Sequence, residues 1–307
     1  MTALIVVAGP TASGKSALAL RLAETESGVI VNADSMQLYR DLPIMTARPS
    51  PEDEGRAPHR LYGVLDAEEP ASVGRWLELA GAAIGEAVAA QRPAIVVGGT
   101  GLYLHALLHG LAPVPAIPAE VRTAARARLA ELGAPALHAE LARRDPTMAA
   151  LLRPTDRQRL LRAYEVVIGT GRSLAAWHAM PPGRVRLPPR RLGLALVPPR
   201  AALYERIERR LRNMIEQGAL AELRALHRRA LPPDLPLMKA VAVPDLLAYL
   251  SGRSDLEVAL ERAVMHTRRY AKRQLTWLRR QLPELRPVAE FGDELDPRRA
   301  LALAGPC

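Results

Sequence analysis

The chain has 307 residues with 49% hydrophobic and 24% charged side chains, which is ordinary for a soluble globular protein, and its formal net charge is +10. Its apolar runs are far too short to span a bilayer, and its one cysteine, Cys307, excludes an internal disulfide and a cysteine-rich metal site. The first residues lead directly into an expected strand without a signal-peptide pattern, so we expect a cytoplasmic protein without membrane association.

Five short apolar segments are predicted strands, and helical patterns separate most of them. This alternation predicts a P-loop-type α/β fold, a parallel sheet flanked by helices. The predicted strands are Leu4–Ala8, Val29–Ala33, Arg60–Leu65, Ala94–Val97 and Leu192–Val197.

A long stretch without strands separates the fourth predicted strand from the fifth. Proline-rich segments bound it, and it contains three predicted helices, Glu120–Leu132, Ala136–Arg144 and Thr155–Gly169. We therefore predict a helical insertion domain at 114–188, between a first part of the core at 1–113 and a second part at 189–307. The second part continues as basic helices to about Leu282, namely Arg200–Gly218, Ala219–Arg229, Val243–Leu250 and Leu256–Leu282, followed by a weakly specified tail.

The first predicted strand runs into a phosphate-binding pattern, G-x-x-x-x-G-K-[ST], and a helical pattern follows. Strand, glycine loop and helix is the context in which this pattern binds phosphate. Lys15 is expected to reach the terminal phosphate oxygens and Ser16 to offer its hydroxyl to Mg²⁺. The alternative is a glycine-rich turn that matches by chance. The residues of this phosphate loop are Gly9, Pro10, Thr11, Ala12, Ser13, Gly14, Lys15 and Ser16.

Asp34 directly follows the second predicted strand, so it is expected at the same edge of the sheet as the phosphate loop. There it can act as a general base or contact Mg²⁺ through water; the alternative is an N-cap of the next helix. The fourth strand ends in Gly98–Gly101, where a P-loop NTPase more often has an acidic residue. The sequence therefore predicts phosphate binding with an incomplete apparatus for NTP hydrolysis.

Positive charge is concentrated in the second half of the chain. Residues 1–149 contain 13 Lys or Arg and 16 Asp or Glu, whereas residues 150–307 contain 29 and 16. The segment from Arg262 to Arg280 is basic without an acidic residue and includes Tyr270 and Trp277. This pattern predicts a polyanionic partner such as RNA; the alternative is free use of arginine on a solvated surface.

Six segments in order resemble the tRNA dimethylallyltransferases, also called tRNA isopentenyltransferases. The resemblance covers nearly the whole chain. The segments are Gly9–Ser16 (GPTASGKS), Asp34–Tyr39 (DSMQLY), Val97–Leu104 (VGGTGLYL), Asp156–Arg162 (DRQRLLR), Leu203–Ile207 (LYERI) and Arg268–Arg279 (RRYAKRQLTWLR).

The resemblance implies that the phosphate loop holds the diphosphate of dimethylallyl diphosphate, with Mg²⁺ as cofactor. The acceptor is then N6 of the adenosine 3′ of the anticodon in tRNA, turned out of the anticodon loop. Asp34 is the implied general base, with Thr11 and Lys15 completing the catalytic set. A monomer is sufficient for this reaction.

The resemblance also implies a set of tRNA contacts, some of which have exposed helix faces as the alternative. They are Asp34, Ser35, Met36, Gln37, Thr100, Arg122, Gln158, Arg159, Leu160, Leu161, Arg162, Lys272, Arg273, Gln274 and Arg279.

The chain departs from the family pattern at two places. Met45 stands where the family usually has the glycine of I-G-T-A-K-P. Ala240–Asp245 stands where the family has G-Y-K/R-[EQ], with neither the glycine nor the tyrosine. We expect altered RNA contacts in the second segment and an unchanged donor site.

Other functions compete with this hypothesis. The phosphate loop alone is compatible with a small-molecule kinase, and the same donor chemistry is compatible with prenylation of free adenine nucleotides. An RNA-binding protein with a degenerate phosphate loop is the non-enzymatic alternative.

Overall fold

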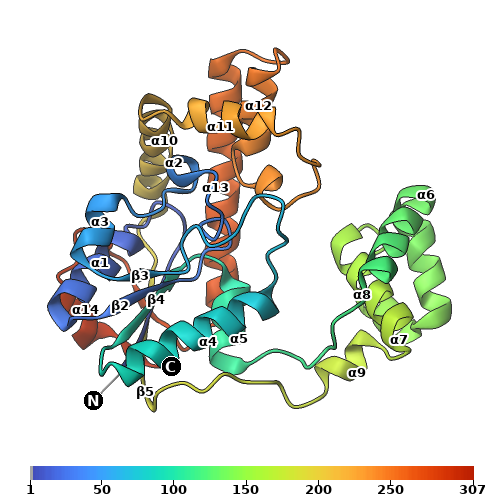
Figure 1. Ribbon diagram of the computed structural model, residues 1–307, viewed down its shortest axis with the longest axis horizontal. Coiled ribbons are helices and arrows are strands. Elements are labelled where there is room, and N and C mark those ends of the chain that lie inside the picture. Colours follow the sequence, from blue (N-terminus) through green and yellow to red (C-terminus); the bar gives the residue numbers. More distant parts are fainter. Residues whose placement is uncertain (1–2) are drawn as a thin grey trace. The chain divides into compact units, whose positions relative to one another are not determined.

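The computed structural model describes residues 3–307. Its main feature is a seven-stranded sheet with helices on both faces (Figure 1). Six strands run parallel in the order β3-β2-β4-β1-β5-β6, and β7 pairs antiparallel with β5. This architecture confirms the predicted parallel α/β sheet. The strands are β1 (Ala3–Ala8), β2 (Val29–Asn32), β3 (His59–Arg60), β4 (Ala94–Gly98), β5 (Arg190–Leu196), β6 (Arg286–Val288) and β7 (Gly305–Pro306).

Strand β1 lies at the centre of the sheet, between β4 and β5, and all its side chains are buried. Helices cover both faces of a parallel sheet, so its central strand is an unbroken apolar run. The register pairs Ala8 with Gly98 and Asn32 with Val97, so β1, β2 and β4 end at one edge. The phosphate loop, Asp34 and the glycine segment therefore leave the sheet side by side.

Five helices enclose the sheet (Figure 1). One face is covered by α1 (Lys15–Glu26), α3 (Pro51–Arg56) and α14 (Pro297–Leu303), and the other by α4 (Val73–Ala89) and α5 (Gly101–His109). None of the helices within residues 3–307 is both long and apolar enough to cross a bilayer.

The helices that follow β5 gather around the long helix α13 (Figure 1). They interact through buried aliphatic side chains, mainly leucine, on one face of each helix. The short helix α2 contacts α11 from the N-terminal part of the chain. These elements are α2 (Pro43–Thr46), α10 (Arg200–Glu216), α11 (Ala219–Arg228), the 3-10 helix η1 (Leu237–Lys239), α12 (Val243–Leu250) and α13 (Leu256–Gln281).

Residues His109–Arg184 form a separate compact unit with a core of its own. The larger unit comprises the chain up to Leu108 and from Val185 onward. Helix α6 contains a break at Gly133, where φ is 75°, so its two halves correspond to the first two helices predicted for the insertion. The helices of the smaller unit are α6 (Ala119–Arg144), α7 (Pro146–Leu151), α8 (Arg157–Thr170) and α9 (Leu174–His178).

The predicted strand Arg60–Leu65 is wrong in its length, because β3 contains only His59–Arg60. Leu61 and Gly63 adopt positive φ angles of 66° and 60°, which turn the chain out of the sheet. Leu65 then forms an isolated parallel bridge with Tyr39. Apolar composition alone does not reveal this turn.

The expectation of a weakly specified tail is also wrong. The chain after Leu282 adds β6, α14 and β7, and Phe291 and Leu295 are buried. Arg21 of α1 donates hydrogen bonds to the carbonyl oxygens of Gly292 and Leu295. The tail thus covers α1 directly behind the phosphate loop.

Candidate active site

The phosphate loop connects buried strand β1 to helix α1. Gly14 is the N-cap of α1 with φ 80° and forms no side-chain cap, and Ala12 also has a positive φ of 65°. The first amides of α1 are therefore free of a capping side chain and form an anion-binding nest. A Cβ on Gly14 would lie 2.7 Å from the backbone nitrogen of Gly292, so the close approach of the tail also requires glycine there.

Two segments that are distant in sequence, the C-terminal tail and helix α13, form hydrogen bonds with the backbone of the phosphate loop. The amide of Gly292 donates to the carbonyl oxygen of Ser13 at 2.9 Å. The side-chain oxygen of Gln274 accepts from the amide of Thr11, and its side-chain nitrogen donates to the carbonyl oxygen of Gly99, both at 2.9 Å. The loop is thereby fixed to β4 and to α13.

Asp34 follows β2 and projects from the same edge of the sheet. Its amide donates to the side-chain oxygen of Asn32 at 2.7 Å, and its own Oδ1 accepts from the amide of Met36 at 3.0 Å. The neighbouring Ser35 amide donates to the hydroxyl of Thr100 at 2.9 Å. These hydrogen bonds fix the position of Asp34. They use its Oδ1 and leave its Oδ2 unused.

Asp34 lies where two adjoining cavities meet. The polar cavity, of about 150 Å³, is lined by the phosphate loop, Asp34 and the arginines Arg206 and Arg210 of α10. The apolar cavity, of about 280 Å³, shares Thr11, Ala12, Asp34, Thr46 and Arg210 with it. Its apolar wall is formed by Met36, Met45, Ile207, Leu211, Met214 and Val241.

The polar cavity brings three cationic side chains, Lys15, Arg206 and Arg210, together with one carboxylate. Burial lowers the pKa of Lys15 to about 8, although the negative charge of Asp34 opposes this shift. Burial also lowers the pKa of Arg210, again opposed by Asp34. Burial raises the pKa of Tyr270, which lines the apolar cavity. Positive charge thus accumulates at the phosphate loop, and Asp34 is the carboxylate facing it.

The residues at the polar cavity fit a magnesium ion that is held mainly by its substrate. Mg²⁺ prefers oxygen ligands and commonly takes one or two from protein, with phosphates and water supplying the rest. Ser16 is exposed, and its hydroxyl lies with Asp34 on the polar cavity. Within residues 3–307 there is no cluster of three or more His, Cys, Asp or Glu that forms a protein-only metal centre.

Comparison with known proteins identifies the family to which this chain belongs. The family model described as IPP transferase matches residues 37–281, and a model described as isopentenyl transferase matches residues 2–67. The chain belongs to the IPP transferase family.

Relatives and solved structures of this family match nearly the whole of this chain. It is 58% identical to a tRNA dimethylallyltransferase of Rhodospirillum rubrum, over 94% of this chain and 88% of that protein. It resembles the crystal structure of the tRNA isopentenylpyrophosphate transferase of Bacillus halodurans (32% identity, 98% and 94% covered, TM-score 0.67). A structure of a eukaryotic dimethylallyltransferase acting on tRNA matches with 26% identity, 94% and 74% covered, and a TM-score of 0.80.

Two residues that the resemblance assigned to RNA form hydrogen bonds within the protein. Gln274 is 6% exposed, and both ends of its amide are bonded to Thr11 and Gly99. Gln37 is 8% exposed, and its side-chain nitrogen donates to the carbonyl oxygens of Thr46 and Ala47, both at 2.8 Å. Gln37 also lines the polar cavity, whereas Gln274 is bonded inside the fold, and the assignment of both residues as RNA contacts stays a prediction.

The remaining sequence-predicted RNA residues lie in both units. On α13, Lys272, Arg273 and Arg279 are exposed. In the smaller unit, Arg122 of α6 is exposed. On α8, Gln158, Arg159 and Arg162 are exposed and Leu161 is half-buried, but Leu160 is fully buried in the core of that unit and cannot contact RNA.

Sequence reasoning missed the contribution of α10 to the site. Arg206 and Arg210 are four residues apart, so they share one face of α10, and both line the polar cavity. The LYERI segment pointed to this helix without assigning a role to either arginine. Met45 and Met214 were also missed as cavity residues, because methionine in a sequence is usually a core residue.

The two departures from the family pattern have different structural consequences. Met45 lies within helix α2 and its side chain forms part of the apolar wall, so the backbone there does not require glycine. Ala242 is the N-cap of α12 and has φ 71°, a left-handed conformation that favours glycine. Ala242 also lines the apolar cavity, so this departure lies in the site itself.

Proposed function

We propose that this chain transfers the dimethylallyl group from dimethylallyl diphosphate to N6 of the adenosine 3′ of the anticodon in tRNA. The observation that carries the proposal is the position of Asp34 at the junction of a cationic, polar cavity and an apolar cavity. A diphosphate fits the first cavity by charge, and a prenyl group with a purine base fits the second by polarity and size.

The donor is held by its diphosphate in the polar cavity. The amides at the N-terminus of α1, Lys15, Arg206 and Arg210 direct positive charge at the oxygens that become more negative as the diphosphate leaves. Mg²⁺, when bound beside Ser16 and Asp34, supplies further neutralisation of the diphosphate charge. The apolar wall around Met45 and Met214 holds the isoprenoid tail and excludes water.

Asp34 acts on the acceptor. A bond forms between adenine N6 and the allylic C1 of the donor, while the bond from C1 to the diphosphate oxygen breaks and its electron pair leaves with the diphosphate. The proton lost from N6 passes to the carboxylate of Asp34. Adenine N6 is a weak nucleophile because its lone pair is delocalised into the ring, so removal of this proton promotes the attack.

The reaction requires the adenosine to be turned out of its stack, because N6 of a paired base is inaccessible to Asp34. We assign the RNA backbone to the basic outer face of α13, with Lys272, Arg273 and Arg279. In the smaller unit we assign further contacts to Arg122, Gln158, Arg159, Leu161 and Arg162, and at the site itself to Ser35, Met36 and Thr100.

A transfer assay with labelled dimethylallyl diphosphate, Mg²⁺ and unmodified tRNA tests the proposal. We expect label in tRNA, located to N6 of adenosine by nucleoside analysis. Label only in free AMP or ATP, offered as competing acceptors, would retain the donor site and reject tRNA as acceptor. Phosphoryl transfer from ATP without any prenyl transfer would support a kinase instead.

A further inference from the structure

One face of helix α11 contacts the segment that follows the catalytic Asp34. Glu222 lies within α11, and Arg229 is its C-cap residue, with helical backbone angles of φ −71° and ψ −10°. They are seven residues apart, close to two helical turns, so their side chains point to the same side. Both reach the segment 41–46, whose last residues are Met45 and Thr46. These two residues line the apolar cavity, so α11 is connected to the cavity wall.

The first contact caps helix α2 from outside. The carboxylate of Glu222 accepts hydrogen bonds from the amides of Ile44 at 2.8 Å and Met45 at 3.1 Å. Helix α2 has no side-chain cap of its own at Leu42, so Glu222 satisfies amides that would otherwise lack a partner. The contact fixes the backbone of Met45.

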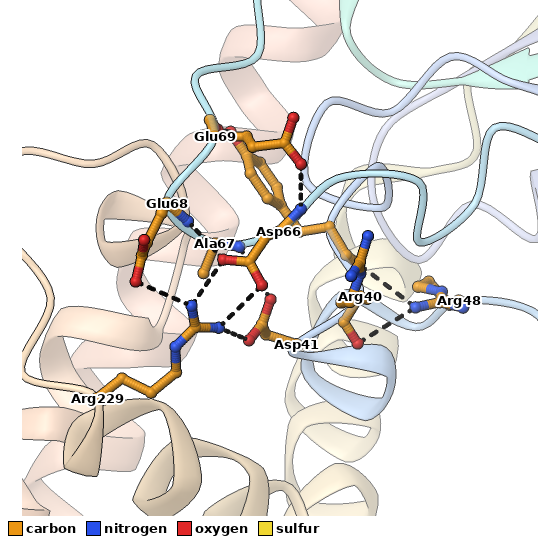
Figure 2. A network of polar contacts seen from close by, with 9 residues as sticks. Arg40, Asp41, Arg48, Asp66, Ala67, Glu68, Glu69 and Arg229 are labelled. Atoms are coloured by element: carbon orange, nitrogen blue, oxygen red, sulfur yellow. Dashed lines mark hydrogen bonds and ion pairs between the residues drawn. The ribbon is translucent and has the colours of Figure 1, made fainter.

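The second contact gathers three carboxylates on one guanidinium group (Figure 2). Arg229 contacts Asp41, Asp66 at 2.6 Å and Glu68 at 3.3 Å. Asp41 also accepts a hydrogen bond from the amide of Ala67 at 3.1 Å. The guanidinium thus joins the turn before α2 to the loop 65–69.

The charges of this network make Arg229 hard to replace. Its side chain is 30% exposed and that of Asp41 only 13%, so salt screens the pair incompletely. Without Arg229, the carboxylates of Asp41, Asp66 and Glu68 face one another with no cation between them. Repulsion would then separate the loops and release the segment 41–46.

We propose that Arg229 is a positioning residue which, together with Glu222, fixes the Met45–Thr46 wall and so determines how tightly the isoprenoid tail is held. This inference rests on the proposed function, in which the apolar cavity takes that tail. After α11 the chain continues through residues 236–242, which form another part of the same wall. Helix α11 therefore influences two parts of the cavity wall. It contacts the segment that carries Met45 and Thr46 through side chains, and the chain that follows it forms the part at residues 236–242.

Replacing Arg229→Gln tests the role in donor binding. We expect the KM for dimethylallyl diphosphate to rise about tenfold with kcat changed less than about threefold, because the wall binds the tail equally in ground state and transition state. The preference for this donor over geranyl diphosphate, a longer allylic diphosphate, should fall. Arg229→Lys should rescue part of the loss, because lysine keeps the charge without the fork of donors that reaches several carboxylates. Arg228→Gln, an exposed neighbour on α11, is the matched control.

Hydrogen exchange, followed in a peptide that covers residues 41–48, measures the contact between α11 and the segment 41–46 independently of enzymatic activity. In Arg229→Gln the amides of Ile44 and Met45 should exchange at least about tenfold faster, with α8 in the other unit unchanged. If Arg229→Gln does not fold, Glu222→Gln should give the same two changes, because its amide retains one acceptor and loses the charge. Unchanged exchange and an unchanged KM in the folded variants would overturn the inference. Absence of transfer by the wild type would reject the proposed function, and the exchange result would still decide the contact.

Discussion

The side-chain oxygen of Gln274 accepts a hydrogen bond from the amide of Thr11 at 2.9 Å, although 263 positions separate the two residues in the chain. Gln274 also donates to the carbonyl oxygen of Gly99, so one amide group connects α13, the phosphate loop and the end of β4. A Cβ on Gly99 would lie 2.3 Å from the side-chain nitrogen of Gln274, which is why glycine follows β4 there. Helix α13 and the phosphate loop are therefore joined by the side chain of Gln274.

Replacing Gln274→Leu should destabilise the protein by about 2–3 kcal/mol, because the partly buried Thr11 amide and the buried Gly99 carbonyl group both lose their partner. Urea unfolding measures this change in the free energy of unfolding, and donor KM should rise with it. Gln281→Leu, at an exposed position of the same helix, should change stability by less than about 0.5 kcal/mol. Equal effects of the two substitutions would argue against the buried contact.

Asp34→Asn should reduce the single-turnover rate of transfer by about 10²–10⁴-fold, because asparagine cannot accept the proton from N6. The asparagine oxygen can still accept from the amide of Met36, so the local backbone should be preserved. Donor and tRNA affinities, measured separately, should change little. A near-normal rate with intact binding would exclude Asp34 as the base.

The affinity of the free enzyme for the donor should fall as pH rises through about 8, where Lys15 loses its charge. With the charged form required for diphosphate binding, Kd should be about threefold higher at pH 8.5 than at pH 7.5. Calorimetric titration at several pH values measures this dependence, and Lys15→Arg should remove it. A Kd that is constant across this range in the wild type would contradict the role of Lys15.

The same lowered pKa affects the stability of the protein without donor, in the opposite direction. Between pH 8 and the ordinary lysine pKa of 10.5, the unfolded chain binds the proton of Lys15 more tightly than the folded chain does. The contribution of this group to stability therefore increases with pH in that window. Lys15→Ala should lose this contribution in thermal unfolding, which separates the folding effect from the binding effect.

Neutralising Arg273 and Arg279 together to glutamine should weaken tRNA binding without altering donor affinity. Both side chains are exposed on α13, and the guanidinium of Arg273 lies 5.6 Å from the ring centre of Tyr270. Loss of two phosphate contacts should reduce the slope of log K against log salt by about 1–2. Neutralising Arg298 and Arg190, exposed arginines outside α13, is the control. An unchanged slope in the α13 variant would place the RNA backbone elsewhere.

The parts of the site that are local in sequence could be predicted from sequence. The phosphate loop follows a buried strand and precedes a helix, so its backbone conformation depends on residues within one short segment. The position of Asp34 could also be predicted, because it directly follows β2 and parallel strands end at the same edge of the sheet. The resemblance added the acceptor and the donor, which neither segment specifies.

The role of Gln274 could not be predicted in this way. It lies in a basic segment typical of RNA contacts, yet its side chain points inward, and only the helix position relative to Thr11 and Gly99 decides this. Arg206 and Arg210 were missed for the same reason. In the sequence they are indistinguishable from arginines on an exposed helix face, although both line the polar cavity.

The sequence by itself determined the central parallel strands, the phosphate loop and the placement of Asp34 beside it, because periodicity, glycine positions and strand ends act over a few neighbouring residues. Only the tertiary structure decided which distant side chains complete the site. Arg210 enters the polar cavity from α10, the tail closes behind Gly14, and Arg229 meets Asp41 across 188 positions. Those contacts depend on how helices pack, and packing is a property of the whole fold.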